Sequence, residues 1–292
     1  MDIHSLNAFV NVAETRSFSI AAEKLFLTQP AVSKRISNLE QQTGCKLFDR
    51  IGRKVFLTEA GATLLPKAKH ILLELEDTQR MLLNLSGRVS GKLSLAVSHH
   101  VSLHRLPDTL RAFSKSHPEV ELDLEFTESE LAYEGILHGD MELAIITLSP
   151  HPHAQIEAIP VWLDNMRFVV ANDHPLTRLD SVSFQDLNQH NAILPDQKTF
   201  TREIAEQHFS AQGLELNVIM STNYLDTIRM MVSIGLGWSL LPETVIDASL
   251  TVLEVPTPEM TRPLGLIFHR DRTLSNAAKV FIELLTVDNL DH

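Results

Sequence analysis

Apolar residues recur at helical spacing three times near the start of the chain, which predicts three short helices. The first spans residues 3–14, and the second begins after the serines of residues 16–19, either of which can cap it. Thr28 can cap the third helix, and Pro30 falls in its first turn, where proline is tolerated. Residues 46–57 then hold two β-prone runs around a basic turn. Together they predict an N-terminal all-α helix-turn-helix with a β-hairpin wing.

A long linker helix is predicted after Thr58, with apolar residues in alternating steps of four and three. This heptad seam lasts about three heptads, which is enough for two helices to pair. The alternative is a helix that packs on its own domain. The helix ends at a linker of small residues, 86–91, where we place a domain boundary. The residues expected to mediate dimerisation are Leu64, Ala68, Ile71, Leu75, Leu82 and Leu85.

Beyond residue 91 the pattern alternates between strands and helices, which predicts an α/β domain with a parallel sheet. Strands are expected at residues 92–97, 120–126, 143–148, 168–171, 192–194, 216–220 and 238–241. Helices are expected at residues 103–116, 129–138, 200–211, 223–234 and 275–286.

Charge is divided unevenly between the two halves of the chain. The net charge is −12, yet residues 1–90 hold 12 Lys and Arg against 9 Asp and Glu, and the remaining 202 residues hold 13 against 28. This asymmetry fits a small module that meets phosphates, attached to a larger domain that avoids them. The start of the chain has neither a basic segment nor an apolar run, so we expect a cytoplasmic protein without a membrane partner. Cys45 stands alone, and we expect it to be a small buried residue without a redox role.

The third helix carries the residue types that read DNA. In a helix-turn-helix the second helix of the motif lies in the major groove, and its first residues meet the base edges. Amide, hydroxyl and cationic side chains separate here from an apolar face, although a solvated basic face on an ordinary helical hairpin is the alternative. The expected DNA-binding residues are Thr28, Gln29, Pro30, Ser33, Lys34 and Arg35, with Arg50 and Arg53 on the wing.

These segments resemble the winged helix-turn-helix of LysR-type transcriptional regulators over residues 1–65. The resemblance is carried by Phe9-x-x-Val12-Ala13-Glu14, Ser17-Phe18-Ser19-x-Ala21-Ala22-Glu23-x-Leu25, Thr28-Gln29-Pro30-Ala31-Val32-Ser33-x-Arg35-Ile36, Leu39-Glu40, Leu47-Phe48-Asp49-Arg50 and Leu57-Thr58-Glu59-Ala60-Gly61. Length, linker helix and the segment from Gly235 to Pro242 extend it more loosely over the rest of the chain.

The resemblance implies a C-terminal region like the periplasmic solute-binding proteins, with two α/β lobes and a small-molecule site between them. It divides the chain into a DNA-binding domain (1–58), a linker helix and hinge (59–91) and an effector-binding domain (92–292). Lobe one would comprise 92–161 and 265–292, and lobe two 162–264. It also implies a tetramer, formed as a dimer of dimers, that acts on double-stranded promoter DNA. RNA polymerase is a further expected partner.

An effector site is expected where strands end and helices begin, because free N–H groups and the helix dipole there favour anions. We therefore expect a small anionic metabolite, such as a carboxylate. The expected contacts are Ser98, His99, His100, Ser102, Thr127, Thr147, Thr199, Thr201 and Asn223. The histidines near residue 100 could instead hold a metal, but no Cys, Asp or Glu accompanies them at ligand spacing, so we expect neither a metal nor a cofactor.

Two other functions compete with a ligand-responsive regulator. An enzyme would need a nucleophile motif, a phosphate loop or a metal motif, and the sequence contains none of the common ones. Gly235 and Gly237 lack the third glycine of a dinucleotide fingerprint, and we expect them to permit close backbone packing instead. A DNA-architectural protein without an effector would explain only the N-terminal part. It should bind random DNA nearly as well as a promoter.

Overall fold

The computed structural model describes residues 1–51 and 54–287 of the chain. These residues form two compact units, which meet between Ser86 and Gly87. Each unit is described by itself below.

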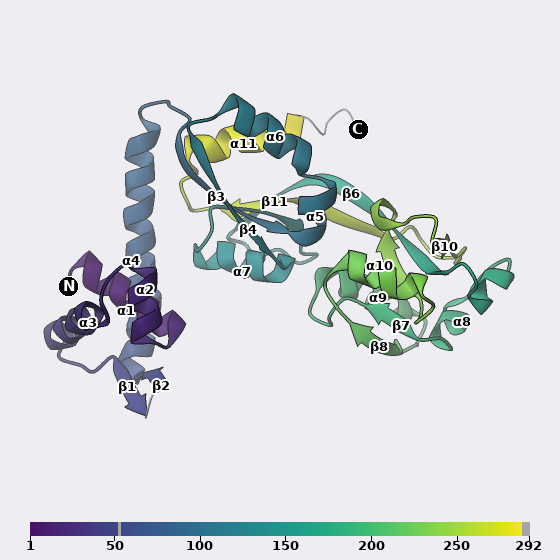
Figure 1. The fold of residues 1–292 in the computed structure, drawn as a ribbon, viewed down its shortest axis with the longest axis horizontal. Coiled ribbons are helices and arrows are strands. Elements are labelled where there is room, and N and C mark those ends of the chain that lie inside the picture. The colour runs from purple at the N-terminus through teal and green to yellow at the C-terminus, as the bar shows by residue number, and fades with distance from the viewer. Residues whose placement is uncertain (52–53, 288–292) are drawn as a thin grey trace. The chain divides into compact units, whose positions relative to one another are not determined.

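The first unit is a bundle of short helices with a two-stranded hairpin, followed by one long helix (Figure 1). Local capping determines where these helices begin: the side chains of Asp2, Ser17, Thr28 and Thr58 each accept a backbone N–H in the first turn of a helix. Apolar faces of the helices and the hairpin bury one common core, which includes Phe9, Val32, Ile36, Leu39 and Phe48. Its elements are α1 (Ile3–Thr15), α2 (Phe18–Lys24), α3 (Gln29–Thr43), β1 (Phe48–Ile51), β2 (Lys54–Leu57) and α4 (Glu59–Asn84).

The long helix α4 divides its apolar residues between two environments. Ala68 is fully buried in the core of the first unit and Leu64 packs against that core, so Ala68 has no surface left for a second chain. The expectation that this residue mediates dimerisation is therefore corrected: here the helix packs on its own domain. Further along, Ile71, Leu82 and Leu85 are exposed. The unpaired part of the seam thus begins near residue 71.

The second unit is built on a seven-stranded sheet in the order β10-β6-β11-β5-β3-β4, with β9 also paired to β6. The expected parallel sheet is only partly correct: β3 lies parallel to β4 and β5, but β11 lies antiparallel to β5 and β6. The main strands are β3 (Gly91–Ser98), β4 (Val120–Thr127), β5 (Leu143–Thr147), β6 (Ile156–Ala171), β9 (Ser239–Pro242), β10 (Leu250–Val252) and β11 (Thr261–His269).

Two further strands and the helices complete this unit. The strands β7 (Ala192–Leu194) and β8 (Val218–Ser221) form a separate parallel pair. The helix expected over 103–116 is two helices, because the chain turns at Arg105 and Leu106 before Pro107 starts the second. The helices are α5 (His99–His104), α6 (Pro107–Ser116), α7 (Ser129–His138), α8 (Phe184–Asn188), α9 (Phe200–Ala211), α10 (Leu225–Ser233) and α11 (Asn276–Val287), with short turns η1 (Pro175–Arg178) and η2 (Glu243–Val245).

The long strands β6 and β11 run through both lobes of this unit (Figure 1). One lobe buries β3, β5 and the first part of β6 against α6, α7 and α11, and the other buries the end of β6 against α8, α9 and α10. The chain passes from one lobe to the other near the middle of β6, where Asp164 lies opposite Arg262 of β11. This pair therefore lies at the hinge.

The structure also shows the surroundings of Cys45, Gly235 and Gly237. Cys45 is exposed, which corrects the expectation of a buried residue. A Cβ on Gly237 would lie 2.4 Å from the backbone oxygen of Asn191, and Gly235 has a φ of +84°, which favours glycine. Both glycines therefore serve backbone geometry, and the close approach is to the segment before β7.

Candidate functional site

The recognition helix α3 presents its polar residues outward from the core of the first unit. Val32, Ile36 and Leu39 are buried, whereas Gln29, Pro30 and Lys34 are exposed and Ser33 and Arg35 are half-buried. The Gln29 amide donates a hydrogen bond to the Ser33 hydroxyl at 2.9 Å. Thr28 caps the helix, since its hydroxyl accepts from the N–H of Ala31. Thr28, Gln29, Pro30 and Lys34 are thus accessible to a partner, and Ser33 and Arg35 are partly accessible.

The wing, formed by β1 and β2, carries two of the predicted DNA-binding residues, Arg50 and Arg53. Arg50 belongs to β1, but its side chain and the whole of Arg53 lie outside the described residues. Their predicted roles in DNA binding stay predictions. One exposed aromatic residue stands next to the recognition helix: Phe26, in the turn between α2 and α3, is 97% exposed and has a φ of +53°.

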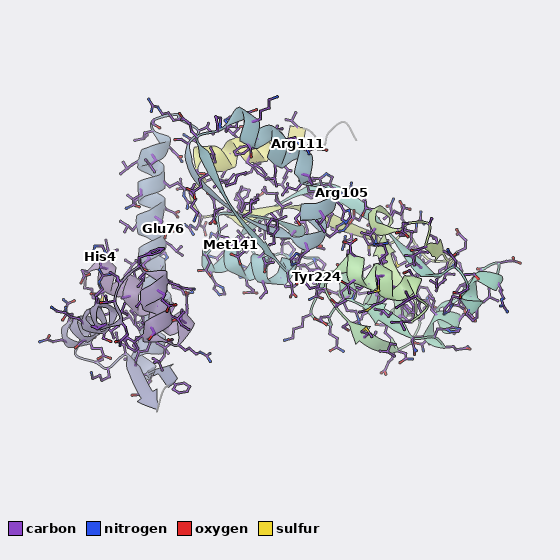
Figure 2. All side chains as sticks on the ribbon, in the orientation of Figure 1. His4, Glu76, Arg105, Arg111, Met141 and Tyr224 are labelled. Carbon is purple, nitrogen blue, oxygen red and sulfur yellow. The ribbon has the colours of Figure 1, made fainter. Side chains whose placement is uncertain are left out.

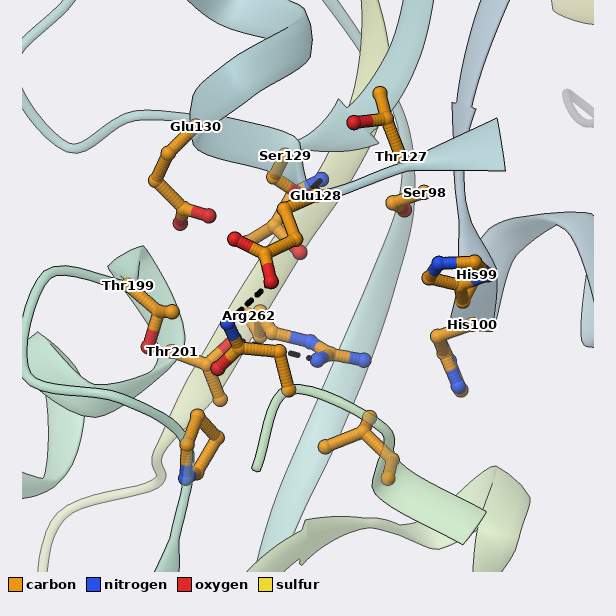
Figure 3. Close-up of a pocket in the computed structure, with 14 residues that line it drawn as sticks. Ser98, His99, His100, Thr127, Glu128, Ser129, Glu130, Thr199, Thr201 and Arg262 are labelled. Atoms are coloured by element: carbon orange, nitrogen blue, oxygen red, sulfur yellow. Dashed lines mark hydrogen bonds between the residues drawn. The ribbon is translucent and has the colours of Figure 1, made fainter. Parts of the chain in front are cut away.

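A cleft between the two lobes of the second unit collects eight of the nine predicted effector residues. One pocket of this cleft is lined by Ser98, His99, His100, Thr127, Thr147, Thr199, Thr201 and Asn223, together with Glu128, Ser129, Glu130, Pro195, Leu225 and Arg262 (Figure 3). The ninth, Ser102, is not among the lining residues, because its hydroxyl turns back to donate to the carbonyl of His99. The pocket leaves about 50 Å³ of free space. A neighbouring hollow of about 600 Å³ shares Glu128, Glu130, Thr199 and Asn223 with it.

The hinge at the base of the cleft holds a buried cluster of charges. The fully buried Asp164 carboxylate accepts from Arg262 at 2.5 Å, from Arg105 at 2.7 Å and lies 3.1 Å from His100 Nε2. Burial alone would raise the pKa of Asp164, but these three partners outweigh it and hold the pKa well below its ordinary value. Burial lowers the pKa of His100 in turn, more than Asp164 raises it. The cluster therefore contains an ionised carboxylate, two guanidinium groups and a neutral imidazole at neutral pH.

Contacts across the cleft join the N-terminus of α7 to the second lobe. The Glu130 carboxylate accepts from the N–H of Phe200 at 2.8 Å, and the ring of Phe200 packs edge-on against Tyr133. Glu128 accepts from the Asn223 amide at 2.8 Å. Burial raises the pKa of Glu130, and the nearby Glu128 adds to this shift.

The helix α5 makes a second set of contacts across the cleft. The rings of His99 and Tyr224 pack in a tilted arrangement with 4.7 Å between their centres, and His104 lies 3.5 Å from Asp226. Arg105, which follows this helix, and Tyr224, at the start of α10, come from the two lobes (Figure 2). The cleft of this structure is therefore bridged by direct contacts between its walls.

Four charged residues of the cleft and its hinge were not predicted from the sequence: Asp164, Arg262, Glu128 and Glu130. Asp164 and Arg262 are 98 residues apart in the chain and meet only because β6 and β11 pair, so no local pattern connects them. Glu128 and Glu130 had a usable signal: they flank the start of the predicted helix at residue 129, directly after a predicted strand.

Within the described residues, no three His, Cys, Asp or Glu side chains gather in a way that could hold a metal ion. His100 and His104 lie beside each other, with 5.0 Å between ring centres, but they engage Asp164 and Asp226 respectively. No helix of the described chain is long and apolar enough to span a bilayer.

A helix-turn-helix with an exposed polar recognition face, followed by a two-lobed α/β domain with a polar cleft, defines the class of ligand-responsive transcriptional regulators. Two family profiles match this chain: "Bacterial regulatory helix-turn-helix protein, lysR family" over residues 3–62, and "LysR substrate binding domain" over residues 86–288. The chain belongs to the LysR family of DNA-binding transcriptional regulators.

Relatives across the family agree with this assignment. An uncharacterized HTH-type transcriptional regulator in the ibpB-leuC intergenic region of Azotobacter vinelandii is 67% identical over 107 residues, which are 37% of this chain and 74% of that protein. The HTH-type transcriptional activator CmpR of Synechocystis sp. is 30% identical over 289 residues, which cover 97% of this chain and 94% of the relative.

Solved structures share the fold of both units. Full-length CbnR in complex with its target DNA matches with a TM-score of 0.65 and 23% identity, covering 98% of this chain and 99% of that one. The effector-binding domain of QuiR in complex with shikimate matches with a TM-score of 0.63 and 20% identity, covering 70% of this chain and 99% of that domain. At these identities the likeness establishes the fold.

Proposed function

We propose that this regulator binds an inverted repeat in promoter DNA as an oligomer and responds to a small metabolite, carrying an anionic group, in the cleft of its second unit. The observation that carries the proposal is the accessible polar face of α3 with a cleft of polar side chains in the same chain. CbnR, whose fold the chain shares, forms a complex with target DNA, and the QuiR domain binds shikimate. A catalytic step forms no part of this function, and its place is the cytoplasm, where promoter DNA is.

The first residues of α3 would read bases. Gln29 can bind adenine through both amide atoms once it leaves Ser33, and Lys34 and Arg35 can reach guanine or the phosphates. Thr28, which caps α3, and Pro30, in its first turn, would position the start of the helix against the DNA phosphates. On the wing, Arg50 and Arg53 would add phosphate or minor-groove contacts.

Pairing of two linker helices would place two recognition helices on one inverted repeat. The exposed residues Ile71, Leu82 and Leu85 with the half-buried Leu75 supply the apolar surface for this pairing. Half-sites should then lie about one helical turn apart. Contacts between second units would give a tetramer, and a change in its arrangement on ligand binding would alter access of RNA polymerase.

Footprinting on the intergenic DNA upstream of the gene tests the DNA-binding part of the proposal. The wild type should protect an inverted repeat and prefer it over random DNA by roughly 10³ or more. Gln29→Ala should abolish most of this preference while retaining the salt-dependent affinity for any duplex. Gln41→Ala, at an exposed position further along α3, is the matched control and should leave the footprint intact. Equal affinity of the wild type for promoter and random DNA would favour an architectural protein instead.

A further inference from the structure

Several groups that could attract an anion to the cleft already have partners within the protein, and the excess positive charge is at the hinge, where Arg262 and Arg105 share one carboxylate. Arg262 is paired with Asp164, and Arg202 at the start of α9 donates to Glu206 at 2.8 Å. The N–H of Phe200, in the first turn of α9, is taken by Glu130. A ligand that carries only negative charge would therefore find few cationic or N–H groups without a partner near Arg202 and Phe200.

Carboxylates, in contrast, are in excess where the two hollows of the cleft meet. Glu128 and Glu130 line both hollows, and Asp196 lines the larger one, which contains Lys198 as a further cation. The hydrogen bonds to Asn223 and Phe200 each use one oxygen, Oε1, of the respective glutamate. Burial raises the pKa of Glu130, and the neighbouring Glu128 adds a smaller contribution, so an ionised pair of glutamates is costly here. A cation bound between them would remove that cost.

Buried donors without partners lie elsewhere on the wall of the same pocket. Ser98 Oγ and Arg262 Nε have no hydrogen-bond partner among the described residues. Both residues are buried, with exposed fractions of 8% for Ser98 and 2% for Arg262. A buried hydroxyl or guanidinium N–H without a partner is costly and marks a place for an acceptor. In Figure 3, Glu130 and Thr199 lie on one side of the pocket and Ser98 and His99 on the other, with Glu128 and Arg262 between them.

We propose that the effector is an α-amino acid, with its ammonium group bound by Glu128 and Glu130 and its carboxylate bound by Ser98 and Arg262. The smaller hollow, with about 50 Å³ of free space, has room for these head groups, and the adjoining 600 Å³ receives the side chain beside Leu131 and Val218. This inference rests on the proposed function, because it assigns a chemical class to the effector of that cleft. Binding replaces contacts between the lobes by contacts through the ligand, so it biases the hinge.

Calorimetric titration of the full-length protein separates the inference from the function on which it rests. The probes are the proteinogenic L-amino acids and, for each, the matched 2-hydroxy acid, in which a hydroxyl replaces the ammonium group. We expect an amino acid to bind and its 2-hydroxy acid to bind at least about 30-fold more weakly, because a buried charge pair is lost. An equal affinity for both members of a pair would overturn the ammonium site but leave an effector cleft for carboxylates.

Variants of the two glutamates give the second readout. Glu128→Gln and Glu130→Gln should each weaken the amino acid at least about 30-fold and change the weak binding of the 2-hydroxy acid far less. Glu134→Gln, at an exposed position of the same helix, is the control and should bind like the wild type. Circular dichroism of each variant checks its fold. If no amino acid binds the wild type, the inference is wrong. The proposed function is also wrong only if carboxylic acids without nitrogen do not bind the protein and do not alter its footprint on DNA.

Discussion

Asp164 shows how one residue can hold two lobes together. Its carboxylate is fully buried at the hinge and pairs with two guanidinium groups, so the cluster keeps one excess positive charge. Removing one partner of a buried ion pair costs more than the pair contributes, because the remaining charge stays in a medium of low polarity. The value of this residue therefore lies less in net stability than in keeping Arg262 compensated beside the cleft.

Asp164→Asn should lower the free energy of unfolding of the second unit by about 3 kcal/mol or more, because Arg262 would then be buried without a counter-charge. Chemical denaturation followed by circular dichroism measures the change. Asp108→Asn, which removes the exposed ion pair with Arg111, is the matched control and should cost less than about 1 kcal/mol. Equal effects of the two substitutions would contradict the buried-charge argument.

His100 should make stability depend on pH. Burial lowers its folded pKa below the ordinary value of 6.5, so the unfolded chain takes up a proton first as the pH falls. Stability is then full above about pH 6.5 and declines below it. We expect His100→Gln to flatten this decline between about pH 7 and the folded pKa, measured as the midpoint of denaturation at a series of pH values. Parallel profiles of variant and wild type would show that His100 does not titrate in this way.

At the scale of single elements, α4 joins a buried half to an exposed half. Its N-terminal turns pack Leu64 and Ala68 into the first unit, whereas Leu82 and Leu85 are exposed to solvent. An exposed apolar row at heptad spacing is costly for a monomer and favourable for a helix pair. The apolar residues of one helix can thus stabilise a domain at one end and an oligomer at the other.

Replacing Leu75 and Leu82 together by Asp should convert the proposed dimer to monomers, because two charges per chain would enter the seam. Sedimentation velocity measures the oligomeric state, and the melting temperature of the first unit should change little since Leu82 is 64% exposed. Gln79→Asp, at an exposed position off the seam, should leave the dimer intact. A double variant that remains a dimer would show that the dimer interface does not lie on this seam.

Elements whose ends depend on neighbouring residues could be predicted from the sequence, and those that depend on distant pairing could not. Thr28 and Thr58 mark the starts of α3 and α4 through caps within three residues. Residues 156–167 of β6 and all of β11 were not predicted, because polar residues such as Asp164 and Asn165 interrupt the apolar pattern and β11 supplies the partner strand only in the fold. The same non-local pairing hides the hinge cluster of the site, whereas the strand-end hydroxyls of the cleft follow from the alternation of strands and helices.

At the scale of the whole molecule, the distribution of charge separates the two tasks of the chain. Residues 1–90 carry a net charge of +3 and the remaining residues −15, although the protein as a whole is acidic. Phosphates should therefore be neutralised by the first unit alone, and the acidic second unit should discourage binding to DNA outside the site. The total charge says little about nucleic-acid binding when it is divided in this way.

The dependence of DNA affinity on salt tests this division. The slope of log K against log salt is negative, and each lost phosphate contact should reduce its magnitude by about 0.9. Lys34→Ala should therefore reduce the magnitude by about 1 per protomer and weaken binding to all sequences similarly. Lys115→Ala, at an exposed position of α6 in the acidic unit, should leave the slope unchanged. Fluorescence anisotropy over a range of salt concentrations measures both. If the two variants lowered the slope equally, the second unit would also bind the phosphates, and the charge asymmetry would not assign DNA binding to the first unit alone.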